Sequence, residues 1–450
     1  MTSSPELLDL ATRVAGMAQG GEQVEVYASR GRATSVKAYE GEVESFTSAE
    51  SFGIGVRVVR ADKRQGFASA GSLDEGIVAE VLADARDNAA FAEPDEWAGV
   101  AEPDGVDVTP IELWHPALLE LGTEAKVALA IELERVVRAG DPRIAGVRSA
   151  AYGDSAGEGA VATSTGIAVY DRATFCHLAV TALARDGDET QVGGGVAVGR
   201  EPGELDLAEA AADAVERATR LLGARQPPSQ RLTVVLEPRL AATLLGIVGG
   251  MLRGDVVLKG RSPFADRVGE QIASPLLTYV DDPTDHRSLA ADSHDGEGLA
   301  TRRNALIADG VLQGFLHDTY TGRRSGAGST GSAVRGSRST PTPGLQAPAL
   351  RPGARDLDTI VAGLDGALLV QSMHGLHSGV NAVSGDFSVG ADGVMIRDGA
   401  LAEPVREVTL ASTLQRLLLD VVEVGNDLEW LPGGSGAPTL VIADVALSGK

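Results

Sequence analysis

The sequence predicts an α+β protein with two domains: N-terminal helices packed on antiparallel strands, and a strand-rich C-terminal domain. Three observations support this prediction. The chain has 450 residues, of which 43% are hydrophobic, so it can form more than one ordinary core. Long helical patterns are concentrated in the first half, whereas short strand patterns predominate in the second. The 56 glycines supply the turns that many short strands require.

The N-terminal domain is expected to span residues 1–225. Its first helix should run from Ser4 to about Met17, because Ser caps helices and Pro5 fits the first helical position. Residues 91–110 contain three prolines and many acids, so we expect an exposed connection there. The other expected elements are strands at Gln23–Ala28 and Ala33–Tyr39, a hairpin of Gly53–Arg60 with Gly66–Ala70, helices at Leu73–Ala89, Thr123–Ala139 and Glu204–Leu222, and short strands from Ile144 to Val198.

The C-terminal domain is expected to span residues 226–450. Gly223 and the pair Pro227-Pro228 end the preceding helix and mark the boundary. The two halves also differ in charge, since residues 1–225 carry 20 basic and 38 acidic groups, and residues 226–450 carry 19 and 25. The expected elements are strands at Leu232–Leu236, Leu276–Val280, Asn304–Ile307, Leu312–His317, Val394–Ile396 and Thr439–Val445, and helices at Pro238–Leu252 and Leu410–Val422.

Composition excludes several classes of protein. The single cysteine, Cys176, rules out a disulfide framework and a CxxC metal site. The first basic residue, Arg13, is not followed by an unbroken apolar stretch, and no run of about 18 apolar residues occurs, so we expect a soluble cytoplasmic protein without a membrane span. The net charge of −24 disfavours direct nucleic-acid binding, because a phosphate backbone would be repelled.

Residues 321–355 contain six arginines and no acid, among many Gly, Ser, Thr and Pro residues. This composition predicts a long mobile surface loop. A second interpretation is a flexible segment that closes over a partner or binds a carboxylate, because the guanidinium group fits a carboxylate with two parallel hydrogen bonds.

Three polar clusters could hold a ligand. The runs Asp281–His286 and Asp292–Glu297 offer carboxylate and imidazole groups to a cation, but such runs usually form solvated turns. The stretch Met373–Ser388 contains His374 and His377 among recurring Ser and Gly residues. Two imidazoles do not complete a zinc site, which needs three or four ligands, so a structural turn is the simpler interpretation.

Several separated motifs occur together along the chain. They are Tyr39–Val43, Gly53–Val58, Asp295–Gly298, Arg302–Asn304, Asp309–Leu312, Gly375–Ser388, Ala391–Gly393, Ile396–Gly399 and Gly425–Leu428. In these motifs and their order, the sequence resembles the TldD/PmbA family, whose members are also called modulators of DNA gyrase. The resemblance covers nearly the whole chain, and it implies the same α+β fold.

The family has two branches. TldD-like members carry an HExxxH motif on a helix early in the second domain and act as zinc peptidases, whereas TldE (PmbA)-like members lack the motif and pair with a TldD-like chain. The corresponding stretch here, Ala241–Met251, contains neither His nor Glu, and the later Cys of a TldD-like metal site is also missing. Neutral apolar groups cannot bind Zn²⁺ or act as a general base. The chain therefore resembles the TldE branch, and we expect no metal ligand and no catalytic residue in it.

The resemblance implies a non-catalytic subunit of a heterodimeric zinc metallopeptidase that processes or degrades unfolded peptides. Zinc would be supplied by a TldD-like partner, and this chain would need no cofactor of its own. We expect the peptide to contact a turn and an Arg-bearing segment that face a shared interior. The candidate peptide-binding residues are His374, His377, Ser378, Asn381, Asp386, Arg323 and Arg324.

Two other functions stay open. The chain could be an independent hydrolase whose metal site combines His374 and His377 with Asp386 or with the acids of residues 292–297. It could instead be a peptide-binding module without a peptidase role, acting on a toxin, an antitoxin or gyrase.

Overall fold

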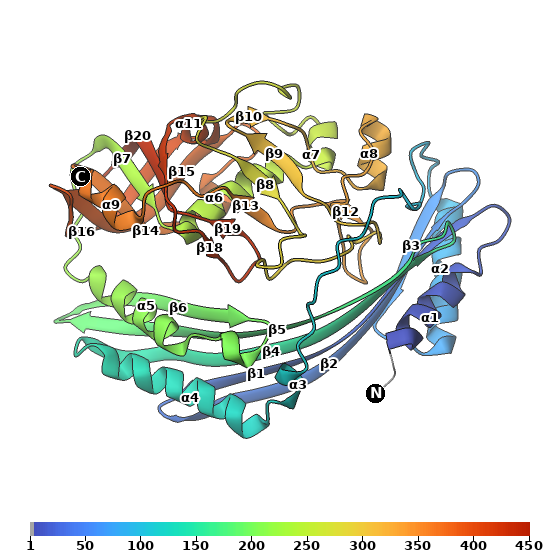
Figure 1. Cartoon of the computed structure of the whole chain (residues 1–450), viewed down its shortest axis with the longest axis horizontal. Helices are drawn as coiled ribbons and strands as arrows, with labels where there is room; N and C mark the ends of the chain where they lie inside the picture. The colour runs from blue at the N-terminus through green and yellow to red at the C-terminus, as the bar shows by residue number, and fades with distance from the viewer. Residues whose placement is uncertain (1–3) are drawn as a thin grey trace.

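The computed structural model describes residues 4–450, and its N-terminal half is built on one long, curved sheet (Figure 1). The six strands follow the order β3-β2-β1-β4-β5-β6, and every neighbouring pair is antiparallel. Because chain neighbours pair with each other except for β1 and β4, most of this sheet forms from local hairpins. The strands are β1 (Gln23–Tyr39), β2 (Glu42–Val59), β3 (Gln65–Ala70), β4 (Ile144–Thr163), β5 (Ala168–Asp186) and β6 (Glu189–Gly199).

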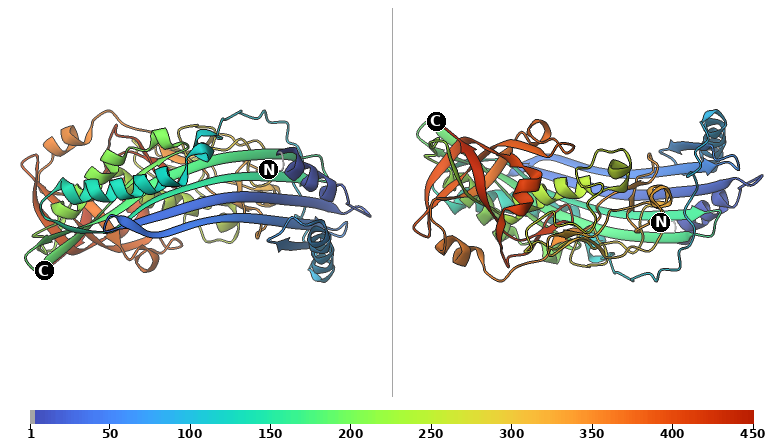
Figure 2. Two further views of the ribbon diagram at one scale, coloured as in Figure 1. Left: turned by 90° about the horizontal axis from the view of Figure 1, so that it is seen from below. Right: turned by 90° about the horizontal axis from the view of Figure 1, so that it is seen from above.

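Helices cover one face of this sheet in two groups. Alternate residues of a strand point to opposite faces, so Val24, Val26 and Ala28 of β1 pack under the helices while Glu25 and Tyr27 point the other way. Helices α1 and α2 cover one end of the sheet, and α4 and α5 cover the other (Figures 1 and 2). The helical elements are α1 (Ser4–Ala15), α2 (Glu75–Phe91), α3 (Ala117–Glu120), α4 (Thr123–Gly140), a 3₁₀ turn (Pro202–Glu204) and α5 (Leu207–Arg220).

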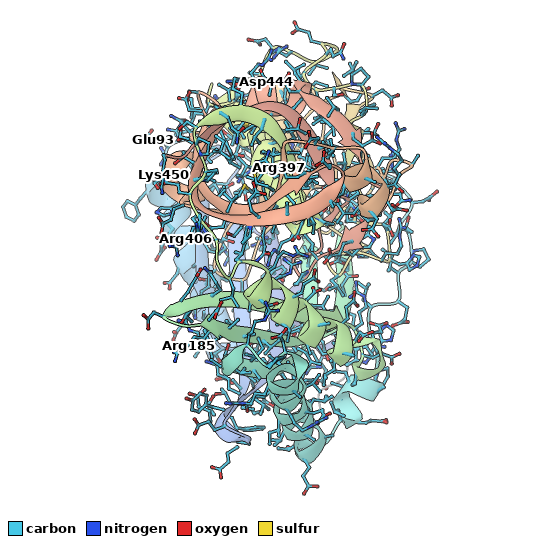
Figure 3. All side chains as sticks on the ribbon, turned by 90° about the vertical axis from the view of Figure 1, so that its left-hand side faces the viewer. Glu93, Arg185, Arg397, Arg406, Asp444 and Lys450 are labelled. Atoms are coloured by element: carbon cyan, nitrogen blue, oxygen red, sulfur yellow. The ribbon has the colours of Figure 1, made fainter. Side chains whose placement is uncertain are left out.

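The C-terminal half contains a small barrel, which is seen end-on in the upper part of Figure 3. Its sheet has the order β16-β15-β14-β7-β20-β17, and an additional pairing of β16 with β20 closes five of the strands into a ring. The side chains inside it are Leu, Val, Ile, Met and Phe. The strands are β7 (Gln230–Leu236), β14 (Ala367–His374), β15 (Asp386–Arg397), β16 (Ala400–Thr413), β17 (Val421–Val424) and β20 (Leu440–Ser448).

A second, looser sheet of six very short strands packs beside the barrel, in the order β10-β9-β8-β13-β19-β18. Its strands are β8 (Tyr279–Asp281), β9 (Asn304–Ala308), β10 (Val311–Leu312), β13 (Pro348–Leu350), β18 (Glu429–Trp430) and β19 (Gly436–Ala437), and a separate pair is formed by β11 (Ala333–Val334) and β12 (Thr342–Pro343). The helices of this half are α6 (Pro238–Met251), α7 (Gly254–Leu258), α8 (Thr319–Ser325), α9 (Leu357–Ala362), α10 (Leu376–Gly379) and α11 (Leu414–Leu419).

The α+β fold class is confirmed, and the differences from expectation concern element lengths. The two strands expected at Gln23–Ala28 and Ala33–Tyr39 are one strand, because the polar residues between them continue the ladders to β2 and β4. The short strands expected after Ile144 are three long ones. The helix expected at Leu410–Val422 begins only at Leu414, because the preceding residues still pair with β15. The domain division after residue 225 stays a prediction.

Residues 321–355 do not form the long surface loop that their composition predicts. The segment contains the end of α8 and the strands β11, β12 and β13, and several of its residues are buried. The side chain of Arg335 is fully buried, and its ion pair with Glu25 of β1 offsets the cost of burying its charge. Among residues 4–450, no helix has the length and hydropathy that a membrane span requires.

Candidate functional site

A large cavity lies between the helix-free face of the N-terminal sheet and the C-terminal half. Its volume is about 610 Å³, and strands β1, β4 and β5 form one wall. The opposite wall comes from residues 290–296, 333–335 and 345–346. The cavity is therefore shared by the two halves of the chain, as binding clefts between structural units often are.

Part of the sheet wall of this cleft lacks large side chains, although Tyr27, Arg30 and Glu158 also line it. Gly31 of β1 is paired with Gly157 of β4, and Ser29 is paired with Gly159, so glycines lie next to each other across the strands. A Cβ atom added at Gly157 would have no heavy atom within 4 Å. An extended chain could therefore approach this face of the sheet closely, although β4 is already paired with β1 and β5 along both of its edges.

An imidazole–carboxylate pair connects the two walls and thereby joins the two halves. Nδ1 of His294 lies 2.9 Å from Oδ2 of Asp171 on β5. Burial alone would lower the pKa of His294, but the hydrogen bond and charge of Asp171 raise it above its ordinary value. Burial and the charge of Asp171 raise the pKa of the neighbouring Asp292 to about 7. The carboxyl group of Asp292 therefore titrates near neutral pH.

A buried group of four ionisable residues includes Arg335, which lines the cleft. Nη2 of Arg57 donates to Oε2 of Glu25 at 2.6 Å and to Oε1 of Glu297 at 3.4 Å. Arg335 forms an ion pair with the same Glu25, and its guanidinium lies 5.3 Å from the ring centre of Tyr27. Glu25 and Arg57 come from the N-terminal sheet, whereas Glu297 and Arg335 come from the C-terminal half. The group therefore connects the halves with two guanidinium groups and two carboxyl groups.

The two acids of this group differ in protonation. Burial would raise the pKa of Glu25, but Arg57 and Arg335 outweigh it and hold that pKa below its ordinary value. Glu297 has only the more distant contact with Arg57, so burial raises its pKa to about 8. Oε2 of Glu297 also accepts the backbone N–H of Thr319 at 2.8 Å, which attaches α8 to the group. Of these two acids, Glu297 is therefore the one that is more readily protonated.

Helix α6 has one apolar face and one face of small residues. Leu244, Leu245 and Val248 are buried in the barrel core. On the other side, a Cβ atom added at Gly246 or at Gly250 would meet no heavy atom within 4 Å. The stretch Ala241–Met251 offers no His, Cys, Asp or Glu, so its side chains do not fit a zinc ion. Among residues 4–450, no group of three or more such side chains is arranged to hold a metal.

Family models match most of this chain in three consecutive parts. The model described as PmbA/TldA metallopeptidase domain 1 matches residues 24–89, the central domain matches 116–222, and the C-terminal domain matches 229–449. This chain belongs to the PmbA/TldD metallopeptidase family.

Individual members of the PmbA/TldD family agree over nearly the whole length. Metalloprotease PmbA of Escherichia coli O157:H7 is 28% identical over 90% of this chain and 88% of its own. A metalloprotease TldD homolog of Haemophilus influenzae is 27% identical over 88% and 86%. The structure of TldE from Thermococcus kodakarensis superposes with a TM-score of 0.87 over 99% of this chain and 100% of its own, at 24% identity. A protein described as a modulator of a DNA gyrase from Thermotoga maritima gives a TM-score of 0.89 at 24% identity, covering 99% of this chain and 100% of its own. At these identities the two structures establish the fold.

Within this PmbA/TldD fold, the five candidate residues of the C-terminal turn lie on the surface. Nε2 of His374 lies 2.7 Å from Oδ2 of Asp392, and α10 carries His377 and Ser378, both exposed. Oδ1 of Asn381 accepts the backbone N–H of Val383, and Oδ2 of Asp386 accepts the hydroxyl of Ser384. No residue of this turn lines the cleft. The imidazole of His374 pairs with Asp392, whereas the alternative metal site requires Asp386 or the acids of residues 292–297.

The two candidate arginines lie on α8, near a different cavity. This cavity has a volume of about 390 Å³ and includes Arg324, whose Nη1 donates to the hydroxyl of Tyr320 at 3.3 Å. Nη2 of Arg323 donates to the carbonyl of Val100 at 2.8 Å, so it attaches the 91–110 connection to the C-terminal half. Neither of these two cavities is lined by any residue of the turn around His374. The contact of the two arginines with a peptide stays a prediction.

Sequence reasoning did not identify Glu25, Arg57 and Asp171. A usable signal was present for the first two, because each is a single charged residue within an apolar strand: Val24-Glu25-Val26 and Val56-Arg57-Val58. A charge at such a position is buried unless the strand has a wet face, and it then requires a partner. Of the two acidic runs, Asp282 and Asp285 form turns with their own backbone, but Asp281 and Glu297 are fully buried.

Proposed function

We propose that this chain is the zinc-free subunit of a two-chain cytoplasmic metallopeptidase, and that it helps a TldD-like partner to hold unfolded peptides for cleavage. One observation carries the proposal: the chain belongs to a metallopeptidase family, yet helix α6 has no side chain that could bind zinc or act as a base. Hydrolysis would then depend on the partner, and this chain would contribute surfaces to the shared chamber.

The cleft supports a role in holding peptides. Its sheet wall around Gly157 and Gly159 exposes backbone instead of large side chains. A wall without large side chains leaves room for side chains of different sizes in a bound peptide, which suits a protein that handles many unfolded sequences. Polar contacts would come from Asp171 on the sheet wall and from His294 and Asp292 on the opposite wall.

The first test compares the chain alone with the chain in a complex. The purified protein, a family member with HExxxH from the same organism, and their mixture are assayed for cleavage of an unfolded peptide with and without a chelator. We expect chelator-sensitive cleavage from the mixture and none from this chain alone. Chelator-sensitive cleavage by this chain alone would contradict the proposal. If the two chains bind each other but cleavage is unchanged, the binding-module function is favoured instead.

The second test narrows the cleft without disturbing the fold. The variant G157V adds a β-branched side chain to a strand at a position with no heavy atom within 4 Å of the new Cβ. We expect unchanged thermal stability and about a tenfold lower kcat/KM of the mixture for an unfolded peptide, equivalent to about 1.4 kcal/mol. G146V is the matched control, because Gly146 lies on the same strand outside the cleft and also has free space around it. Equal effects of the two variants would exclude the cleft as the peptide site.

A further inference from the structure

The outer border of strand β2 is unpaired along more than half of its length. Strand β3 pairs only with Ile54–Val59, while β1 pairs with β2 from one end to the other. Between Glu42 and Gly53, the border away from β1 therefore has no strand beside it among the described residues. Figure 2 (left) shows β2 along the border of the sheet, with α2 near only one end of it.

This border has the properties of a pairing surface. All residues from Glu42 to Phe52 are exposed, including three large apolar side chains: Val43 at 43%, Phe46 at 44% and Phe52 at 47%. At about 3.4 Å per residue, the open border is about 40 Å long. The stretch contains no Pro and no Lys, which commonly protect edge strands. Its single bulge is at Glu44, opposite Lys37/Ala38 and near the hairpin tip, so the ladder from Ser45 to Gly53 is regular. Such an edge can accept a further strand through backbone hydrogen bonds.

Charge determines which strand the edge can accept. The stretch Glu42–Gly53 carries Glu42, Glu44 and Glu50 and no basic residue. If two copies paired antiparallel about Thr47, Glu44 of each copy would face Glu50 of the other. Directly opposed like charges destabilise a pair of strands, and both chains already carry a net charge of −24. The edge therefore disfavours a second copy and favours a strand with basic residues.

We propose that the outer edge of β2, from Glu42 to Gly53, docks an edge strand of a different polypeptide that carries Lys or Arg opposite Glu44 and Glu50. This inference rests on the proposed function in one respect, since the TldD-like subunit would be that polypeptide. The added strand extends the curved sheet across both chains. It also covers Phe46 and Phe52, which lie on the helix side of the sheet, because they alternate with the residues that face the cleft.

The first experiment uses only this chain and changes the charge of the edge. The full-length variant E42K/E44K/E50K is mixed with wild type, and the mass of the species in solution is measured by light scattering after size exclusion at low salt. We expect wild type alone and the variant alone not to associate through this edge, and the mixture to form a one-to-one pair that dissociates as salt is added. Absence of pairing in the mixture, or pairing of wild type alone with amide protection at residues 42–53, would overturn the proposal.

The second experiment uses the HExxxH-bearing family member from the same organism. Hydrogen exchange is measured on wild type with and without that chain, and we expect slower exchange at residues 42–53 in the complex. The variant E42K/E44K/E50K should bind that chain at least tenfold more weakly than wild type. The control E80K/E120K/E124K changes the same total charge at exposed glutamates on helices α2, α3 and α4, and it should bind as wild type does.

The outcomes separate this inference from the proposed function. If wild type and both triple variants bind the HExxxH chain equally and restore cleavage equally, the edge proposal fails and the proposed function stands. If the mixture of wild type and E42K/E44K/E50K pairs through residues 42–53 but the HExxxH chain does not associate with wild type, the edge is a docking surface and the proposed function fails.

Discussion

The two histidine-bearing regions of this chain have opposite environments. His374 lies on an exposed turn with its side chain 62% accessible, whereas the side chain of His294 is 14% accessible and lies between the two halves of the molecule. Each imidazole is paired with one aspartate, at 2.7 Å and 2.9 Å respectively. Around His294, however, three further acids have raised pKa values because they are buried: Asp292, Asp295 and Glu297. The two His–Asp pairs are alike in composition, but only the pair of His294 is mostly buried among other acids. Sequence spacing does not show which of the two pairs is buried.

The largest expected effect is the loss of Arg57 from the buried charged group next to the cleft. R57L leaves Glu297 without its cation and leaves Glu25 with Arg335 alone, so we expect a loss of about 3–5 kcal/mol in unfolding free energy. Denaturant unfolding measures this loss. R13L is the control, because Arg13 pairs with Glu75 on the surface and its loss should cost less than about 1 kcal/mol. Similar losses for the two variants would show that the buried group does not hold the halves together.

The second-largest expected effect is a pH dependence of the unfolding free energy, caused by buried acids in and beside the cleft. The pKa of Glu297 is raised to about 8, that of Asp292 to about 7 and that of Asp295 to about 6, so the folded protein binds more protons than the unfolded chain between about pH 5 and 8. Stability from these groups is fully present at low pH, below their ordinary values, and is lost as pH rises through the raised pKa values. A single group contributes a slope of up to about 1.4 kcal/mol per pH unit.

The variant E297Q tests this assignment. Gln does not titrate, so the decline in unfolding free energy between pH 5 and 8 should become shallower, whatever the stability of the variant at one pH. E132Q is the control, because the exposed Glu132 forms only an i,i+3 pair with Arg135 and should leave the slope unchanged. A decline as steep in E297Q as in wild type would show that Glu297 is ionised throughout this range.

The fold was predictable from sequence where pairing is local. In the N-terminal sheet, hairpins connect most neighbouring strands, and the helices α2 and α4 have clear apolar periodicity. In the C-terminal half, β7 lies between β14 and β20, which are more than a hundred residues away in the chain. Seven of its other strands have only two or three residues, too short for any alternation to show. Local patterns could therefore identify β7 and α6 but not the barrel that they complete.

The candidate site was predictable only in part for the same reason. The sequence identifies the run Asp292–Glu297 as a polar cluster, but its partners Asp171 and Arg57 lie more than a hundred residues earlier in the chain. The turn Gly375–Ser388 stands out in the sequence because its polar residues are contiguous, and contiguous polar residues are usually exposed. A burial prediction for isolated charges within apolar strands would have identified the buried group before the exposed turn.

The smallest expected change in unfolding free energy comes from H374A. H294A is the matched substitution with which it is compared. H374A removes an exposed ion pair, so we expect a change in unfolding free energy below about 0.5 kcal/mol. H294A removes a mostly buried imidazole that joins β5 to the C-terminal half, and it should cost about 1–2 kcal/mol. A larger loss for H374A than for H294A would contradict the comparison. Because H374A is expected to leave the fold intact, any rise it causes in KM of the two-chain peptidase would report a direct contact between the turn and the peptide.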